Sequence, residues 1–171
     1  MSQVPASQLH ATERRRALRD ALGCFATGVT VVTTVEKGGD PVGLTINSFS
    51  AVSLEPALVL FCLGERANSL PVFLAAEFFA VNILSLEQER LSSRFARAGG
   101  DKWSDLSFSR GLGGCPLLPG CVATFECRRK FSYPGGDHVI LVGEVERYEW
   151  HATREPLLFL RGAYGGFRAD L

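Results

Sequence analysis

Hydrophobic residues recur at two different spacings along this chain. Between Thr12 and Phe25 they recur every three or four residues opposite a charged face, which predicts an amphipathic helix. From Val29 onwards, stretches rich in β-branched residues predict strands instead. We expect the helix to cover one end of the β-structure that follows it.

The first two predicted strands form a hairpin. Residues 29–35 and 41–46 are both rich in apolar and β-branched residues, and the polar turn 37–40 joins them. Residues 57–63 are a continuous apolar run, which is typical of a strand covered on both faces. We therefore expect this third strand at the centre of the sheet.

Two short helices and a further strand are predicted in the middle of the chain. Ser69 is placed to cap a helix that ends near Ala75, and residues 78–83 resemble a strand. Residues 85–88 form a capping box, so we expect a second helix that runs towards Ala96. Residues 108–120 are rich in glycine and proline, which predicts a loop rather than a packed element.

A long hairpin is predicted in the last third of the chain. Residues 121–133 and 138–150 flank a Pro-Gly-Gly turn, and alternate residues from Val139 to Val145 provide one apolar face. The chain thus combines many strands with three short helices and lacks alternation of strand and helix. This pattern predicts a mainly β fold, an antiparallel barrel with peripheral helices.

Length and charge narrow the possible partners. A chain of 171 residues with 46% hydrophobic residues is suited to a single domain, 1–171, and we expect residues 1–11 to be flexible. The 18 basic residues equal the 18 acidic residues in number, so no overall charge attracts nucleic acid or an anionic membrane. No apolar run reaches the roughly 18 residues of a membrane span, and we expect a cytoplasmic protein.

The five cysteines are an odd number and form no CxxC pair, so we expect reduced thiols rather than disulfides. Cys115, Cys121 and Cys127 recur at equal spacing, and a metal site is the alternative interpretation. No histidine pair lies beside them, and buried cysteine often acts as a small hydrophobic residue. We therefore predict no metal site.

The common nucleotide-binding and hydrolase motifs are missing. The chain has no GxGxxG, no GxxxxGK[ST] and no GxSxG, so a nucleotide must bind in another way. Residues 43–53 carry five polar side chains, too many for one buried strand face, because a buried polar group without a partner costs about 1–3 kcal/mol. Hydroxyls, an amide and backbone N–H groups together suit a phosphate and a ribityl chain. A water-facing edge strand is the alternative interpretation. The five residues are Thr45, Asn47, Ser48, Ser50 and Ser53.

Three segments in the same order resemble the flavin reductase family that serves two-component monooxygenases. They are residues 25–33, residues 43–53 with the following Glu55-Pro56, and residues 136–145, within a resemblance that spans residues 17–166. The resemblance implies a six-stranded antiparallel FMN-binding split barrel, Greek-key-like, that forms a homodimer. It also implies a flavin near the subunit interface.

The resemblance further implies a set of flavin-binding residues. Those beside the ring and the ribityl chain are Gly28, Val29, Thr30, Thr45, Ile46, Asn47 and Ser48, and those near the phosphate or the ring edge are Ala51, Val52, Ser53, Cys62, Leu63 and Ser69. Phe95 and Tyr164 match aromatic positions near the ring, and Arg66 is a candidate ion-pair partner of the phosphate. For Phe95 and Tyr164 the alternative is core packing. Lys102 and Trp103 resemble a Lys-aromatic pair of the family.

His138 is the predicted catalytic residue. It lies just past a Gly-Gly turn, where the resemblance implies a histidine near the nicotinamide nucleotide. A strand-start histidine that bonds only to the backbone is the alternative. Because the two nucleotides carry the redox chemistry, a site of Ser, Thr, Asn and backbone groups suffices without a strong acid or base.

The predicted function is transfer of a hydride from NADH or NADPH to FMN or FAD, which supplies reduced flavin to a partner monooxygenase. One alternative is a flavoprotein of the same barrel that holds FMN tightly, such as a ferric or other metal-complex reductase. The other is a flavin-binding module without enzymatic activity. Residue types alone decide neither the flavin nor the nicotinamide nucleotide.

Overall fold

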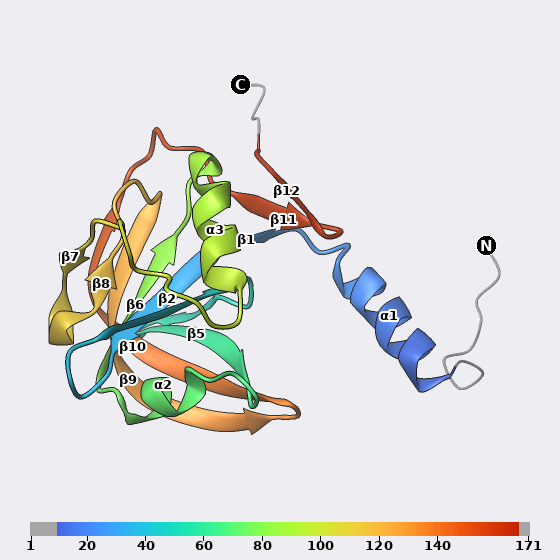
Figure 1. Cartoon of the computed structure of the whole chain (residues 1–171), viewed down its shortest axis with the longest axis horizontal. Coiled ribbons are helices and arrows are strands. Elements are labelled where there is room, and N and C mark those ends of the chain that lie inside the picture. Colours follow the sequence, from blue (N-terminus) through green and yellow to red (C-terminus); the bar gives the residue numbers. More distant parts are fainter. Residues whose placement is uncertain (1–9, 168–171) are drawn as a thin grey trace.

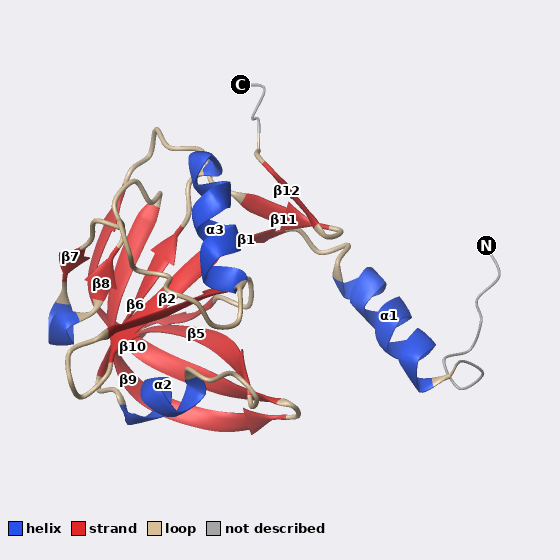
Figure 2. Cartoon of the chain, in the orientation of Figure 1, coloured by secondary structure: helices blue, strands red, loops and turns tan. Residues whose placement is uncertain are grey.

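A curled antiparallel sheet of seven strands is the main feature of the computed structural model, which describes residues 10–167 (Figures 1 and 2). The strand order is β3-β2-β6-β9-β10-β5-β4, and β3 also contacts β5 across the open side of the curl. The mainly β fold is therefore confirmed, although this sheet has seven strands instead of the six expected. Its strands are β2 (Thr30–Val35), β3 (Pro41–Ile46), β4 (Ser50–Leu54), β5 (Ala57–Gly64), β6 (Phe78–Ile83), β9 (Ala123–Gly135) and β10 (His138–Trp150).

Three α-helices and two small sheets surround this sheet in the described part of the chain. The helices are α1 (Ala11–Leu22), α2 (Leu70–Ala75) and α3 (Glu89–Ala96), and the 3-10 turn η2 (Leu86–Gln88) precedes α3. One small sheet joins β1 (Thr27–Gly28), β11 (Leu158–Leu160) and β12 (Ala163–Gly165). The other joins β7 (Ser109–Arg110) to β8 (Pro116–Leu117), with η3 (Leu112–Gly114) between them.

The predicted hairpins and helix starts are mostly confirmed. β2 pairs with β3 from Thr30↔Ile46 to Val35↔Pro41, and β9 pairs with β10 along almost their whole length. The capping box opens η2, because the Ser85 N–H donates to Gln88 Oε1 at 2.9 Å. Ser69 does precede α2, but its side chain makes no capping hydrogen bond.

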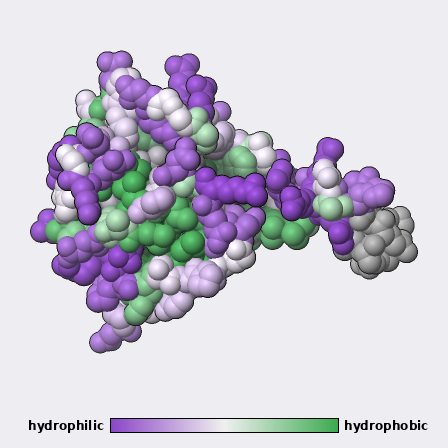
Figure 3. All heavy atoms as spheres, turned by 60° about the horizontal axis from the view of Figure 1, so that its bottom comes forward, coloured by the Kyte–Doolittle hydropathy of each residue, from purple (hydrophilic) through white to green (hydrophobic). Residues whose placement is uncertain are grey.

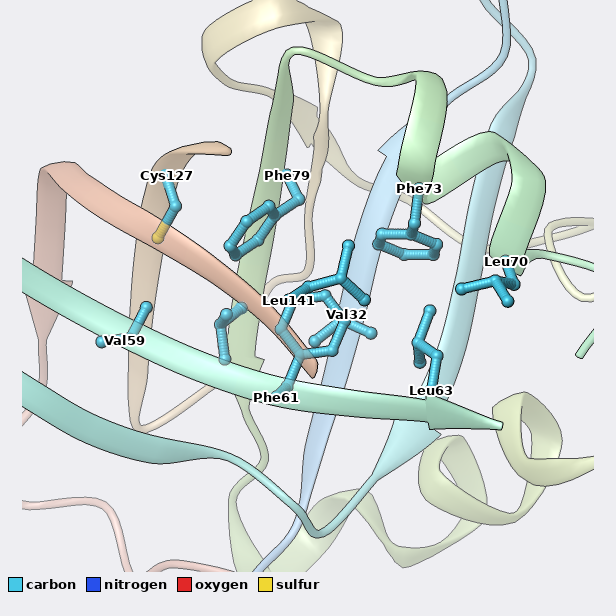
Figure 4. Packing of buried hydrophobic residues seen from close by; sticks show 10 residues of the cluster. Val32, Val59, Phe61, Leu63, Leu70, Phe73, Phe79, Cys127 and Leu141 are labelled. Atoms are coloured by element: carbon cyan, nitrogen blue, oxygen red, sulfur yellow. The ribbon is translucent and has the colours of Figure 1, made fainter. Parts of the chain in front are cut away.

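The main hydrophobic core fills the inside of the curl. Its buried side chains come from β2, β5, α2, β6, β9 and β10, and Phe61 packs edge-on against both Phe73 and Phe79 (Figure 4). The members of this cluster are Val32, Val59, Phe61, Leu63, Leu70, Phe73, Phe79, Val81, Cys127 and Leu141.

The prediction of a central strand at residues 57–63 is wrong. β5 lies next to the edge strand β4, and its residues alternate between buried and half-buried side chains. Val59, Phe61 and Leu63 face the core, whereas Leu58, Leu60 and Cys62 lie on the outer face. In β5, a continuous apolar run therefore does not mean that the protein covers both faces of the strand.

A second core lies on the other side of β2, under α3 and the loops that follow it. It contains Val29, Val31, Leu84, Phe95, Leu118, Cys121 and Leu157. The expectation of an unpacked loop at residues 108–120 is wrong, because Cys115 and Leu118 are buried and Thr33 Oγ1 donates to the Pro116 carbonyl at 2.6 Å. Asn82 on β6 holds the same loop by accepting the Leu118 N–H at 2.8 Å.

Helix α1 does not cover the barrel, contrary to expectation. It projects away from the body of the molecule (Figure 1), and none of its residues is buried. Leu18, Leu22 and the following Phe25 are 61%, 66% and 77% exposed. His10 and Ala11, expected in the flexible segment, are the N-cap and first residue of α1, while residues 1–9 lie outside the described residues.

All five cysteines are free thiols. Burial raises the pKa of Cys115 to about 11 and the pKa of Cys121 and of Cys127 to about 12, so these three remain protonated at neutral pH. Among residues 10–167 no group of three or more His, Cys, Asp or Glu side chains is arranged to hold a metal ion. No helix in the same range is long and apolar enough to cross a membrane.

Candidate functional site

A cleft of about 490 Å³ runs along the edge strand β3. Residues 41–45 of β3 form its floor, because β3 pairs only with β2 and leaves its other edge open. Residues 66–69 and Val72, at the start of α2, form one wall, and residues 95–103 after α3 form the other. We call it the β3 cleft, and its size is in the range of small-molecule sites.

Gly43 lets α3 and the loop after it approach the floor of the cleft closely. A Cβ atom on Gly43 would lie 2.9 Å from Phe95 Cε1 and 3.0 Å from Trp103 Cζ2, closer than side chains normally pack. Phe95 and Trp103 meet edge to face, with ring centroids 4.9 Å apart. The α3 wall of the β3 cleft thus contains an aromatic pair that packs directly against Gly43.

Charged residues line the β3 cleft at both ends. Arg66 lies at the α2 end, and Arg97, Asp101 and Lys102 lie at the α3 end. Lys102 Nζ donates to the Phe95 carbonyl at 3.0 Å, and burial lowers the pKa of this ammonium. The Asp101 carboxylate accepts the backbone N–H groups of Trp103 and Ser104, and these bonds lower its pKa.

A chain of hydrogen bonds ties the cleft floor to α3 and to the C-terminal hairpin. Thr45 Oγ1 donates to the Ser92 carbonyl at 2.7 Å, and Ser92 Oγ lies 2.8 Å from the Tyr164 hydroxyl. Ser92 is fully buried, so a lost partner at this position would leave a polar group unsatisfied. The Tyr164 hydroxyl therefore contacts Ser92, and its ring packs against Phe159 in the second core.

Ser48 bridges the segment after β3 to the middle of β5. Its Oγ accepts the Cys62 N–H at 2.9 Å and lies 3.2 Å from the Cys62 carbonyl, to which it donates. Burial raises the pKa of the half-buried Cys62 thiol. β3 and β5 are not paired in the sheet, and the contacts between Ser48 and Cys62 hold the end of β3 close to β5.

The hydroxyl groups of residues 43–53 have protein partners, which we did not expect from their number. Besides Thr45 and Ser48, Ser50 donates to the Ala51 carbonyl at 3.1 Å and Ser53 donates to the Pro56 carbonyl. The argument that these groups require a ligand is therefore wrong. Their oxygens can still accept a further hydrogen bond, and the Asn47 side chain is exposed.

The predicted flavin-binding residues divide into three groups in the structure. Thr45, Ser69 and Phe95 line the β3 cleft. The side chains of Val29, Thr30 and Leu63 are buried, so these residues offer mainly backbone groups to a ligand. The remaining residues do not line the cleft. They lie at the end of β3, on the connection to β4, on β4, on the outer face of β5 or in the small sheet of β1, β11 and β12, and they are Ile46, Asn47, Ser48, Ala51, Val52, Ser53, Cys62, Gly28 and Tyr164.

His138 begins β10 directly opposite Gly64, the last residue of β5. A Cβ atom on Gly64 would lie 3.8 Å from His138 Nε2, while His138 Nδ1 lies 2.7 Å from Asp137 Oδ1. This hydrogen bond lowers the pKa of Asp137. His138 thus lies beside the segment that leads from Gly64 to Arg66, one wall of the β3 cleft, with its Nε2 turned towards that segment.

Sequence analysis missed the loop at residues 96–103 as a wall of the cleft. Gly99 and Gly100 both have positive φ angles, 75° and 77°. The available signal was the position of this glycine pair directly before Asp101, Lys102 and Trp103, because a tight turn brings such side chains back onto the preceding strand.

Comparisons with known proteins agree with one another. The family model of the flavin reductase like domain matches residues 22–168. The chain is 46% identical over 155 residues to the FMN reductase (NADH) SmoA of Agrobacterium fabrum, which covers 91% of this chain and 87% of that protein. It is 42% identical over 158 residues to the reductase component of the flavin-dependent trigonelline monooxygenase of Acinetobacter baylyi, which covers 92% of this chain and 51% of that protein.

A solved structure shows the same fold. The chain matches the NADH:FAD oxidoreductase SgcE6 of Streptomyces globisporus, in complex with NAD and FAD fragments, with a TM-score of 0.88. The two share 39% sequence identity, and the match covers 95% of this chain and 98% of that one. The chain spans only about half the length of some curated relatives, 48% of a probable flavin reductase of Rhizobium meliloti among them.

Ser48→Ala should lower the free energy of unfolding by about 1–3 kcal/mol, because the Cys62 N–H loses its acceptor. Urea denaturation followed by far-UV circular dichroism measures this loss. Ser50→Ala is the matched control, since Ser50 is exposed and donates only to its neighbour, so its effect should stay within about 0.5 kcal/mol. Equal stability of the two variants would show that Ser48 does not hold the sheet.

Proposed function

The chain belongs to the flavin reductase like domain family, and from that premise we propose that it transfers a hydride from NADH to a flavin that it then releases. Reduced flavin would pass to a separate oxygenase component. The names of the relatives support this, since one is an FMN reductase (NADH) and another is the reductase component of a monooxygenase. The observation that carries the proposal is the β3 cleft, which has nucleotide-sized volume and basic groups in a chain of zero net charge.

We further propose that the curled sheet is the split barrel of this family. β3 and β4 lie at opposite edges of the sheet, and each lacks a second strand partner. β3 nevertheless contacts β5, and Ser48, in the connection from β3 to β4, hydrogen-bonds to Cys62 of β5. A barrel that is split at this place gives a ligand access to the unpaired backbone groups of β3.

The residues that line the cleft suit a flavin nucleotide. Arg66, Asn68 and Ser69 at the α2 end offer a guanidinium, an amide and a hydroxyl to a phosphate. Asn47 offers an exposed amide beyond the other end of β3, where the predicted ribityl contacts lie. The half-buried side chains of Trp103 and Val72 offer an apolar surface that suits a flat aromatic ring, and the fully buried Phe95 packs against Trp103.

The reaction needs little chemistry from the protein. The two nucleotides supply the hydride donor and the hydride acceptor, so the tasks of the chain are binding, orientation and exclusion of water. His138 and Asp137, at the hairpin tip beside the Gly64 end of β5, are placed to bind the nicotinamide nucleotide. The β3 backbone, held rigidly by Thr45 and Ser48, orients the ring that lies against it.

We propose that the chain forms a homodimer. The exposed face of α1 carries Leu18 and Leu22, followed by Phe25, and Phe131 and Tyr133 are exposed on β9. Figure 3 shows hydrophobic residues at the surface in the middle of one face of the barrel and again near the base of α1. A helix that projects without covering its own barrel is suited to cover that of a second copy.

The five free cysteines support a cytoplasmic location, because reducing conditions keep thiols free. Nicotinamide nucleotides are then available to the enzyme in the same compartment.

The purified chain should oxidise NADH only when free FMN or FAD is added, because the flavin is a substrate. Absorbance at 340 nm follows the reaction, and gel filtration before the assay removes any bound flavin. Turnover without added flavin after this step would indicate a tightly held prosthetic group. Flavin binding without turnover would indicate a binding module instead.

His138→Ala should raise KM for NADH severalfold while the dissociation constant of the flavin stays within twofold, because His138 lies at the hairpin tip rather than in the cleft floor. Steady-state kinetics and flavin fluorescence titration measure the two quantities. His151→Ala is the control, since His151 follows β10 at the other end of the hairpin. Equal losses for both ligands would remove His138 from this role.

Leu22→Asp should weaken the dimer, because it places a charge on the apolar face of α1. Light scattering coupled to size exclusion should then show a larger monomer fraction than for the wild type. Arg16→Asp, on the same helix, is the control for a change of charge alone. A wild-type chain that is monomeric at micromolar concentration would contradict the proposal.

A further inference from the structure

We propose that a row of arginines along α3 and at its C-cap binds the adenosine diphosphate half of a dinucleotide whose reacting ring lies in the β3 cleft. The proposal rests on the proposed function and extends it to a second binding region. The row consists of Arg90, Arg94 and Arg97. Both NADH and FAD carry the adenosine diphosphate group, so the chemistry that the row recognises is shared by the two.

The row lines a separate cleft that adjoins the β3 cleft. This second cleft has a volume of about 430 Å³, and we call it the arginine cleft. Arg97 and Asp101 line both clefts, so the two meet at these residues. A ligand that extends past the α3 end of the β3 cleft therefore enters the arginine cleft. Its lining residues are Glu89, Arg90, Ser93, Arg94, Arg97 and Asp101.

Positive charge is concentrated along the two clefts. Five basic residues line them, Arg66, Arg90, Arg94, Arg97 and Lys102, against three acidic ones, Glu36, Glu89 and Asp101. The chain as a whole carries 18 residues of each sign. An excess of two positive charges in adjoining clefts of a neutral chain focuses anionic ligands on this place.

The spacing of the row suits a long, flexible anion. Arg90 and Arg94 are four residues apart and lie on the same face of α3, and Arg97 is the C-cap residue that follows the last turn. The row covers about two turns, roughly 10 Å along the helix axis. Guanidinium groups bind phosphate through paired, charge-assisted hydrogen bonds, which a single lysine does not provide.

None of the three arginines forms a salt bridge within residues 10–167, and two of them make no side-chain hydrogen bond there either. Arg94 donates to the carbonyl of Ser104 and so holds the loop after α3. Asp101 also lines the arginine cleft, and its Oδ1 accepts the backbone N–H groups of Trp103 and Ser104 at 2.9 and 3.0 Å. Arg90 and Arg97 are exposed and form no salt bridge within residues 10–167, so their guanidinium groups are available to a ligand.

The positions of the basic groups favour a dinucleotide over a mononucleotide. Arg66, at the α2 end of the β3 cleft, is placed for the phosphate next to the ribityl chain of a flavin. Arg97 lies on the opposite side of the same cleft, and Arg90 lies beyond it in the arginine cleft. A flavin whose ribityl phosphate lies at Arg66 carries any second phosphate bonded to the first, so it leaves the second group free. The pyrophosphate of NADH, or of an FAD that lies the opposite way round, reaches that group instead.

The test is the double variant Arg90→Gln/Arg97→Gln in the full chain, compared with Arg147→Gln. Arg147 is an exposed arginine on β10 that lines neither cleft. We expect KM for the dinucleotide to rise about tenfold in the double variant, with kcat within twofold, and no change in the control.

The choice of flavin distinguishes the two sources of adenosine diphosphate. If NADH occupies the arginine cleft, KM for NADH rises with FMN and with FAD alike. If FAD occupies it, KM rises for FAD but not for FMN or NADH. Unchanged KM values for all three ligands, or changes that Arg147→Gln reproduces, would overturn the proposal.

Binding of ADP alone separates this proposal from the proposed function. Isothermal titration calorimetry should show that ADP binds the wild type and binds the double variant about tenfold more weakly, without any need for turnover. If the wild type binds ADP in this way but does not oxidise NADH, the proposed ADP site is supported and the proposed reductase function is contradicted. If the double variant binds ADP as tightly as the wild type, the proposed ADP site is contradicted even when the reductase is active.

Discussion

The hydroxyl of Ser48 holds together the two parts of the sheet between which the candidate site lies. β3 and β5 are not paired strands, yet Ser48 both accepts from and donates to the backbone of Cys62 in β5. The bond lets the barrel curl almost closed while the outer edge of β3 stays unpaired. Because that edge is the floor of the cleft, its position relative to α2 depends on this contact.

Packing on the far side of β2 and β3 fixes the other wall. Gly43 allows Phe95 and Trp103 to approach the strand, and Thr45 donates to the Ser92 carbonyl of α3. Ser92 in turn contacts the Tyr164 hydroxyl, so the C-terminal hairpin also supports α3. The polar residues near the site thus hold its walls in place, and the unpaired groups at the ends of the cleft are left for ligands.

Electrostatics and shape together explain how a neutral chain attracts anionic nucleotides. Five basic residues against three acidic ones line the two clefts, and Arg66, Arg90 and Arg97 among them are exposed. The local field is therefore positive although the total charge is zero. Composition alone did not indicate this, because net charge does not report where the charges gather.

Local patterns in the sequence determined most of the elements and their connections. The β2–β3 and β9–β10 hairpins, the strand β6 and the capping box before α3 follow from residue spacing and turn chemistry, which act over a few neighbouring residues. The order of three short segments also indicated the family, which the comparisons confirmed.

Only the tertiary structure decided that α1 leaves the barrel, that β5 lies near an edge and that the loop at residues 108–120 is packed. It also decided that the hydroxyls of Thr45 and Ser48 have protein partners and that Arg97 joins two clefts. These features depend on contacts between residues far apart in the chain, and a pattern of apolar and polar positions cannot say which distant group will meet a given side chain.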